Sequence, residues 1–206
     1  MFRTLVDKLK NIFNSLIKKK TIQMKSEMYE ERFERWLKVS IGLARFDPFL
    51  MSLVQSLGRM DANLCEKDYE LVEKYLKGGN AEEDYEHIQG HLTQSYLWIL
   101  GAYEVVRSLT QNIKEKKSDD PLEVFERFQT TKNRFTRLRI PLAKFEASKF
   151  HNKTDYQIAY PGFAYEIGIA WKVSDDVVIS RQELSDLFLE TLEFTRVQTL
   201  KRTLDK

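Results

Sequence analysis

The feature that most constrains the fold is an apolar stretch in the middle of a long helical pattern. Residues 96–103 read Tyr-Leu-Trp-Ile-Leu-Gly-Ala-Tyr and include no charged side chain. A helix without a polar face must be surrounded by other elements, because the exposure of apolar side chains to water is unfavourable. We therefore predict one long helix over about Ala81 to Lys116, and we expect it to be the central helix of the protein.

This apolar stretch is too short to cross a membrane. It extends from Tyr96 to Val106 and is interrupted by Glu104, whereas a span needs about 18 or more apolar residues. We expect no transmembrane span and no secretory signal, since the N-terminal segment is periodic rather than solidly apolar. The single cysteine, Cys65, excludes an intramolecular disulfide and a zinc site of several cysteines. These features favour a cytoplasmic protein.

Apolar periodicity and turn residues predict a mainly α fold, a helical bundle with a short β-hairpin before the C-terminal helix. The further helices are expected over about Ser26–Arg45, Pro48–Leu57 (ended by Gly58), Glu66–Lys77 and from Asp120 to a kink or end at Pro141. Two β-branched runs flank Ser174-Asp175-Asp176 and predict the hairpin near residues 165–179. Residues 151–164 are expected to form a loop, and Ser180 with Glu183 forms a capping box that opens the last helix.

The chain divides into residues 1–24, an amphipathic basic helix, and residues 25–206, a single helical domain. In the first segment the apolar residues recur every three or four positions from Phe2 to Ile17 and form one stripe. Residues 1–25 carry seven basic side chains and one acid, which leaves 26 basic and 30 acidic residues in the rest of the chain. Three partners fit the stripe: the chain's own domain or a second copy, an anionic membrane surface bound through residues 2–20, and a groove on another protein.

The three histidines are candidate metal ligands. His87 and His91 are four residues apart on the predicted central helix, so both rings can project from one face, with Asp84 one turn earlier. His151 and Asp155 would complete a site if their loop folded back on this helix. The sequence lacks the glutamate that follows the first histidine in zinc hydrolases, so paired histidines without a metal are the alternative interpretation. No cofactor motif is present.

Residues 127–153 are basic and are a candidate surface for nucleic acid or another anionic ligand. This segment has eight basic residues and one acid, and the candidate contacts are Arg127, Lys132, Arg134, Arg137, Arg139 and Lys144. Interleaved aromatic residues would offer stacking surfaces for single-stranded nucleic acid. The alternative is internal pairing, because residues 61–126 hold fifteen acids that can neutralise these side chains.

Glu104 and Arg107 form a third candidate, a polar pocket beside the apolar stretch. Charges in such surroundings must be paired, and an ion pair that fixes helix packing is the alternative to a substrate contact. The chain has no dinucleotide-binding, phosphate-loop or nucleophile-elbow glycine motif.

The sequence therefore favours a non-catalytic helical protein-interaction module that associates with a protein partner or with itself through its N-terminal helix. Two alternatives stay open: a nucleic-acid-binding accessory protein and a metal-dependent enzyme.

Overall fold

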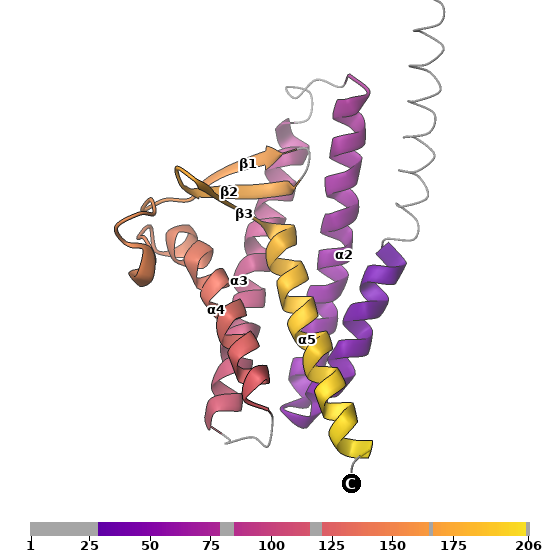
Figure 1. Ribbon diagram of the computed structural model, residues 1–206. Helices are drawn as coiled ribbons and strands as arrows, with labels where there is room; N and C mark the ends of the chain where they lie inside the picture. Colours follow the sequence, from indigo (N-terminus) through magenta and orange to yellow (C-terminus); the bar gives the residue numbers. More distant parts are fainter. Residues whose placement is uncertain (1–28, 79–84, 116–120, 165–166, 205–206) are drawn as a thin grey trace, which may run out of the picture.

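The computed structural model describes residues 29–78, 85–115, 121–164 and 167–204. The predicted amphipathic helix over residues 1–24 lies outside these residues, and so does Asp84. The described helices lie side by side, and successive long helices run in opposite directions (Figure 1).

Helices make up most of the described chain, and the predicted mainly α bundle with a hairpin before the last helix is confirmed. The first helix covers residues 29–41 and continues into the short 3-10 helix η1. The remaining helices are η1 (Gly42–Arg45), α2 (Pro48–Leu76), α3 (Tyr85–Glu115), α4 (Leu122–Ala143), η2 (Lys149–His151) and α5 (Arg181–Leu204).

Helix α2 is continuous through Gly58, so the prediction that this glycine ends a helix is wrong. A Cβ atom on Gly58 would lie 2.3 Å from the Cβ of Trp36. The glycine therefore lets α2 pass close to the helix of residues 29–41, and tertiary packing outweighs its weak helix propensity. The predicted end at Gly78 agrees with the structure, because Gly78 adopts a φ of 85°, the left-handed conformation common after a helix.

Three antiparallel strands lie at one end of the bundle in the order β1-β2-β3 (Figure 1). They are β1 (Tyr160–Ala164), β2 (Gly168–Ser174) and β3 (Val177–Ser180), and β2 with β3 forms the predicted hairpin. Strand β1 falls in the predicted loop over residues 151–164, so that prediction is wrong. Pro161 and Gly162 discourage a strand prediction, but a proline is tolerated in an edge strand such as β1.

The start of α5 is capped as the sequence predicts. The Oγ of Ser180 accepts a hydrogen bond of 2.9 Å from the backbone N–H of Glu183. This contact satisfies one of the N–H groups that a helix leaves free at its first turn. It fixes the point at which the chain turns from β3 into α5.

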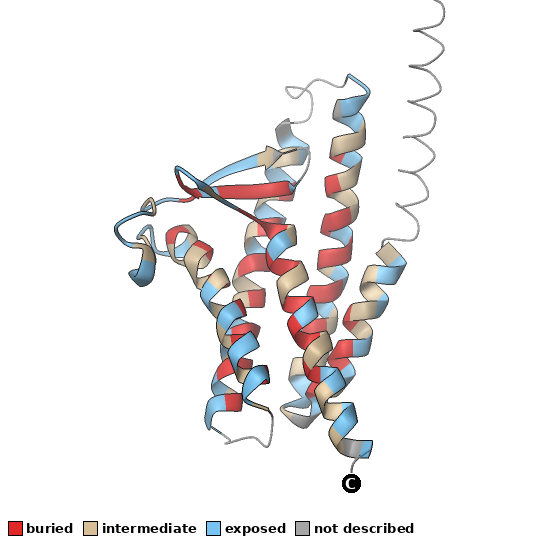
Figure 2. Cartoon of the chain, in the orientation of Figure 1, coloured by how far each residue is buried: buried red, intermediate tan, exposed pale blue. Residues whose placement is uncertain are grey.

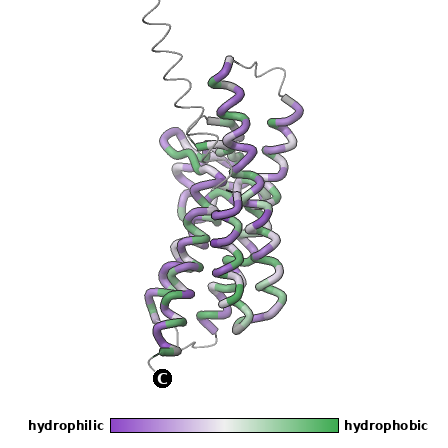
Figure 3. Tube along the Cα trace, turned by 90° about the vertical axis from the view of Figure 1, so that its right-hand side faces the viewer, coloured by the Kyte–Doolittle hydropathy of each residue, from purple (hydrophilic) through white to green (hydrophobic). Residues whose placement is uncertain are grey.

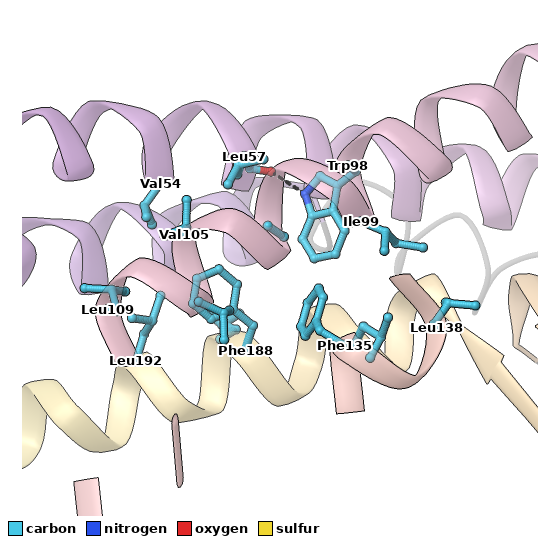
Figure 4. Close-up of a cluster of buried hydrophobic side chains, with 14 of the residues drawn as sticks. Val54, Leu57, Trp98, Ile99, Val105, Leu109, Phe135, Leu138, Phe188 and Leu192 are labelled. Carbon is cyan, nitrogen blue, oxygen red and sulfur yellow. Dashed lines mark hydrogen bonds between the residues drawn. The ribbon is translucent and has the colours of Figure 1, made fainter. Parts of the chain in front are cut away.

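The core is one connected cluster to which the 29–41 helix, the four long helices and the sheet contribute. Figure 2 shows the buried residues on the facing sides of these elements. The indole of Trp98 donates a hydrogen bond of 2.9 Å to the carbonyl of Leu57 and packs beside Phe135 (Figure 4). Phe135 contacts Phe188, which contacts Trp36, so aromatic rings link four helices.

Helix α3 is less enclosed than the sequence predicts. Trp98, Ile99 and Ala102 are buried, but Leu97 is 54% exposed. Apolar and polar residues alternate along the chain trace in Figure 3. None of the helices in the described ranges is both long and apolar enough to span a bilayer.

Candidate functional site

A network of charged side chains lies buried between the helices and the sheet, and Arg181 is at its centre. Arg181 is the first residue of α5 and has no exposed surface. Its guanidinium donates to the Asp61 carboxylate, to Oδ2 of Asp68 at 3.0 Å and to Sγ of Cys65 at 3.2 Å. A cation at a helix N-terminus meets the positive end of the helix dipole, so Arg181 depends on these two carboxylates.

Arg32 is the second arginine of the network and reaches it from the 29–41 helix. It pairs with Asp61, forms an ion pair of 2.7 Å with Asp186, and donates a hydrogen bond of 2.6 Å to Ser185 Oγ. Asp61 also accepts a hydrogen bond of 2.9 Å from the indole of Trp36. The carboxylate of Asp61 therefore ties the 29–41 helix and α5 to α2.

Asp68 connects the network to the sheet and to α3. Its Oδ1 accepts a hydrogen bond of 3.2 Å from the backbone N–H of Ile169 and lies 2.7 Å from Nε2 of His91. Gly168 has a φ of 66°, and a Cβ there would lie 2.5 Å from Cγ of Asp68. Strand β2 thus approaches Asp68 as closely as it does because residue 168 has no side chain.

The two aspartates stay ionised in spite of their burial. Burial by itself would raise the pKa of Asp61, but the charges of Arg181 and Arg32 hold this pKa below its ordinary value. Burial opposes ionisation of Asp68 as well, and the hydrogen bond from His91 and the charge of Arg181 lower its pKa. The two arginines and two aspartates therefore cancel in charge within the core.

Cys65 sits in the same network and is not activated as a nucleophile. Burial, together with the charge of Asp61, raises the pKa of its thiol to about 11. A thiol of such a pKa is protonated at neutral pH and is a poor nucleophile.

Apart from His91, which was a candidate metal ligand, the residues of this network were not identified as site residues from the sequence. Asp61, Cys65 and Asp68 are spaced by four and three, so they share one face of a continuous helix. The sequence predicted two separate helices, Pro48–Leu57 and Glu66–Lys77. Asp61 and Cys65 fell between them, which concealed that relationship. The signal that could have found them is the presence of two carboxylates on the apolar face of α2.

The histidines are placed in two different parts of the fold. His87 and His91 line a cavity of about 460 Å³ between α2 and α3, whereas His151 belongs to η2 and Asp155 makes two hydrogen bonds of 2.8 Å with Arg137. Within the described ranges, histidine, cysteine and acidic side chains nowhere form a group of three suited to a metal ion. The metal site stays a prediction, since Asp84 lies outside those ranges.

The cationic side chains predicted to bind nucleic acid mostly contact groups of the same chain. Each of the four arginines pairs with an acid: Arg127 with Glu123, Arg134 with Glu183, Arg137 with Asp155 and Arg139 with Glu104. The guanidinium of Arg127 also lies 3.9 Å from the centre of the Phe194 ring. Lys132 donates to Gln129, and Lys144 is exposed at the end of α4. Glu104 and Glu123 belong to the acids of residues 61–126, whereas Asp155 and Glu183 lie outside that range. Surface pairs can open for a ligand, so the binding surface stays a prediction.

Glu104 and Arg107 form the predicted ion pair at 2.8 Å, but not in the predicted surroundings. Both side chains are 49% exposed, because they lie on the face of α3 away from Trp98 and Ala102. Arg139 lies 3.8 Å from Glu104 and stacks over Tyr103. The expected deep polar pair is therefore a surface cluster.

Comparison with known proteins adds no template for this site, since no family model, curated protein or solved structure matches the chain. The chemistry has to be judged from geometry. Asp61 and Arg181 have no exposed surface, so a substrate could not reach them without opening the bundle. The network can orient α2, α5 and β2, and it fixes their packing.

Proposed function

We propose that the protein is a non-catalytic helical module that binds protein and associates with a second copy of itself through residues 1–24. The observation that carries this proposal is a group of exposed apolar side chains where the 29–41 helix turns into α2. Phe49 is 85% exposed, Ile41 66% and Leu53 47%. Phe49 and Leu53 are one turn apart on α2 and so share a face, and adjoining exposed apolar side chains mark surfaces that another molecule covers.

The groups of the buried network support a binding role over catalysis at that site. Cys65 is buried and protonated, and the buried carboxylates are neutralised by arginines. A catalytic acid or base needs a pKa near the working pH and access to a substrate, and Asp61 has neither.

The test compares two double variants of the full-length chain by light scattering. Leu9→Ser with Leu16→Ser interrupts the apolar stripe of residues 1–24, and Asn11→Ser with Asn14→Ser changes polar positions of the same segment as the matched control. We expect the unmodified chain and the control to have a mass above the 24.4 kDa of one chain, and the stripe variant to have the mass of one chain.

Equal masses for all three proteins would contradict self-association through this segment. A mass of one chain together with stripe-dependent co-sedimentation on anionic vesicles would assign the segment to a membrane surface instead.

A further inference from the structure

A groove of about 760 Å³ runs between the 29–41 helix and α2 and reaches α3 at Gln94. Phe33, Leu37 and Met60 form the apolar part of its lining, and all three are half-buried. The other lining residues are polar and include Arg59, which lies over the Phe33 ring, and Lys67, which donates a hydrogen bond to Gln94. Its α2 side extends from Ser52 to Lys67. At a rise of 1.5 Å per residue this side is about 22 Å long, which suits a helix of four turns.

Two exposed leucines extend the apolar surface of this groove. Leu53 is one turn from the lining residue Ser56, and Leu97 is one turn from the lining residue Gln94, so each faces the same side of its helix as the groove. The apolar surface therefore spans the 29–41 helix, α2 and α3.

The groove has an acidic border. Phe33 and Leu37 also line a second hollow of about 500 Å³, and its other lining residues are Glu30, Glu31 and Glu34, of which Glu34 pairs with Lys38 at 2.9 Å. All three glutamates are exposed. A bound helix that covers Phe33 and Leu37 would consequently meet three carboxylates along one edge.

We infer that this groove receives residues 2–17 of a second copy of the chain, an inference that rests on the proposed self-association. The apolar stripe from Phe2 to Ile17 covers fifteen residue steps, which as a helix is about 22 Å, the length of the α2 side of the groove. Insertion of an amphipathic helix would bury its apolar stripe against Phe33, Leu37 and Met60.

Charge complementarity at the acidic border, rather than at Arg59 and Lys67 of the lining, supports the same occupant. Residues 1–25 carry seven basic side chains and one acid, including Lys18, Lys19 and Lys20 directly after the stripe. A stripe that lay on the groove with its C-terminal end at the acidic border would bring these lysines to Glu30, Glu31 and Glu34. Opposite charges at the rim of an interface fix its orientation and disfavour other partners.

The chain between the stripe and the first described helix favours a second copy over the chain's own stripe. Residues 18–28 contain no glycine, proline, asparagine or aspartate, and Ser26 is the one residue among them of a type common in tight turns. These residue types make tight chain reversals inexpensive, and a stripe that folded back on its own 29–41 helix would need such a reversal. Exchange between two copies needs none, and it gives two equivalent contacts related by a twofold axis.

The experiment is a charge swap measured by light scattering on full-length proteins. One variant carries Glu30→Lys, Glu31→Lys and Glu34→Lys; a second carries Lys18→Glu, Lys19→Glu and Lys20→Glu; a third combines all six changes. The matched control for the first variant reverses three exposed acids on another face, Glu123→Lys, Glu126→Lys and Glu190→Lys.

We expect the unmodified chain, the control and the third variant, which carries all six changes, to have twice the mass of one chain. The first and second variants, with three changes each, should have the mass of one chain. A doubled mass that neither swap changes would overturn the groove as the docking site and leave self-association standing. If the unmodified protein had the mass of one chain at every concentration, the proposed self-association itself would be overturned.

Discussion

Asp61 and Arg181 are 120 residues apart in the sequence, yet they form an ion pair in which neither side chain has any exposed surface. The pair joins the middle of α2 to the first residue of α5. A buried pair of this kind adds little stability compared with apolar residues, but the loss of one partner leaves a buried charge without compensation. The pair therefore acts mainly to fix how α5 leaves the sheet.

Asp61→Asn should lower the free energy of unfolding by about 3–5 kcal/mol, because Arg181 and Arg32 would lose their shared carboxylate. Urea unfolding followed by circular dichroism measures this change. Glu104→Gln is the control, since it removes an acid from an exposed pair and should cost less than about 1 kcal/mol. Equal losses in the two variants would contradict a network held in the core.

Stability should fall as the pH drops below about 4. Folding lowers the pKa values of Asp61, Asp68 and Asp155. Their stabilising contribution is therefore fully present at a pH above their unfolded-state pKa values, and it is lost as the pH falls through their folded-state pKa values. Each such group adds a slope of up to about 1.4 kcal/mol per pH unit. Unfolding of the Asp68→Asn variant at several acidic pH values should show a shallower slope, and an unchanged slope would contradict the lowered pKa of Asp68.

Gly58→Ala should destabilise the protein by about 1–3 kcal/mol, although alanine is the better helix former, because the added methyl group overlaps Trp36. Gly90→Ala is the matched control: this glycine is also inside a helix, and its added Cβ meets no atom within 4 Å. The control should be neutral or more stable by up to about 1 kcal/mol. Thermal unfolding measures both, and a stabilising Gly58→Ala would contradict the close helix approach.

The thiol of Cys65 should react slowly with Ellman's reagent in the native protein at pH 8, since it is buried and its pKa is raised to about 11. The same protein in concentrated urea should react at the rate of a free thiol. Absorbance of the released thiolate measures both rates. Prompt reaction of the native protein would show that the network opens readily.

The contrast between Gly58 and Ser180 shows what could be predicted from the sequence. Ser180 caps α5 through a contact three residues away, and such local signals, like the apolar periodicity of the helices, were predicted. The role of Gly58 is to leave room for Trp36, which lies on another helix. This role could not be derived from the neighbours of Gly58 in the chain.

The candidate site was missed for the same reason. Asp61, Asp68 and Arg181 acquire their roles from contacts across more than 110 residues. The sequence did place His87 and His91 on one helix, but the hydrogen bond between His91 and Asp68 required the packing of α2 against α3.

The most direct test of the account is sedimentation equilibrium of the unmodified full-length protein over a range of concentrations. We predict a mass that rises with concentration from the 24.4 kDa of one chain toward twice that value and goes no further, because a reciprocal exchange closes with two copies. A mass of one chain throughout, or a mass that grows without limit, would contradict it.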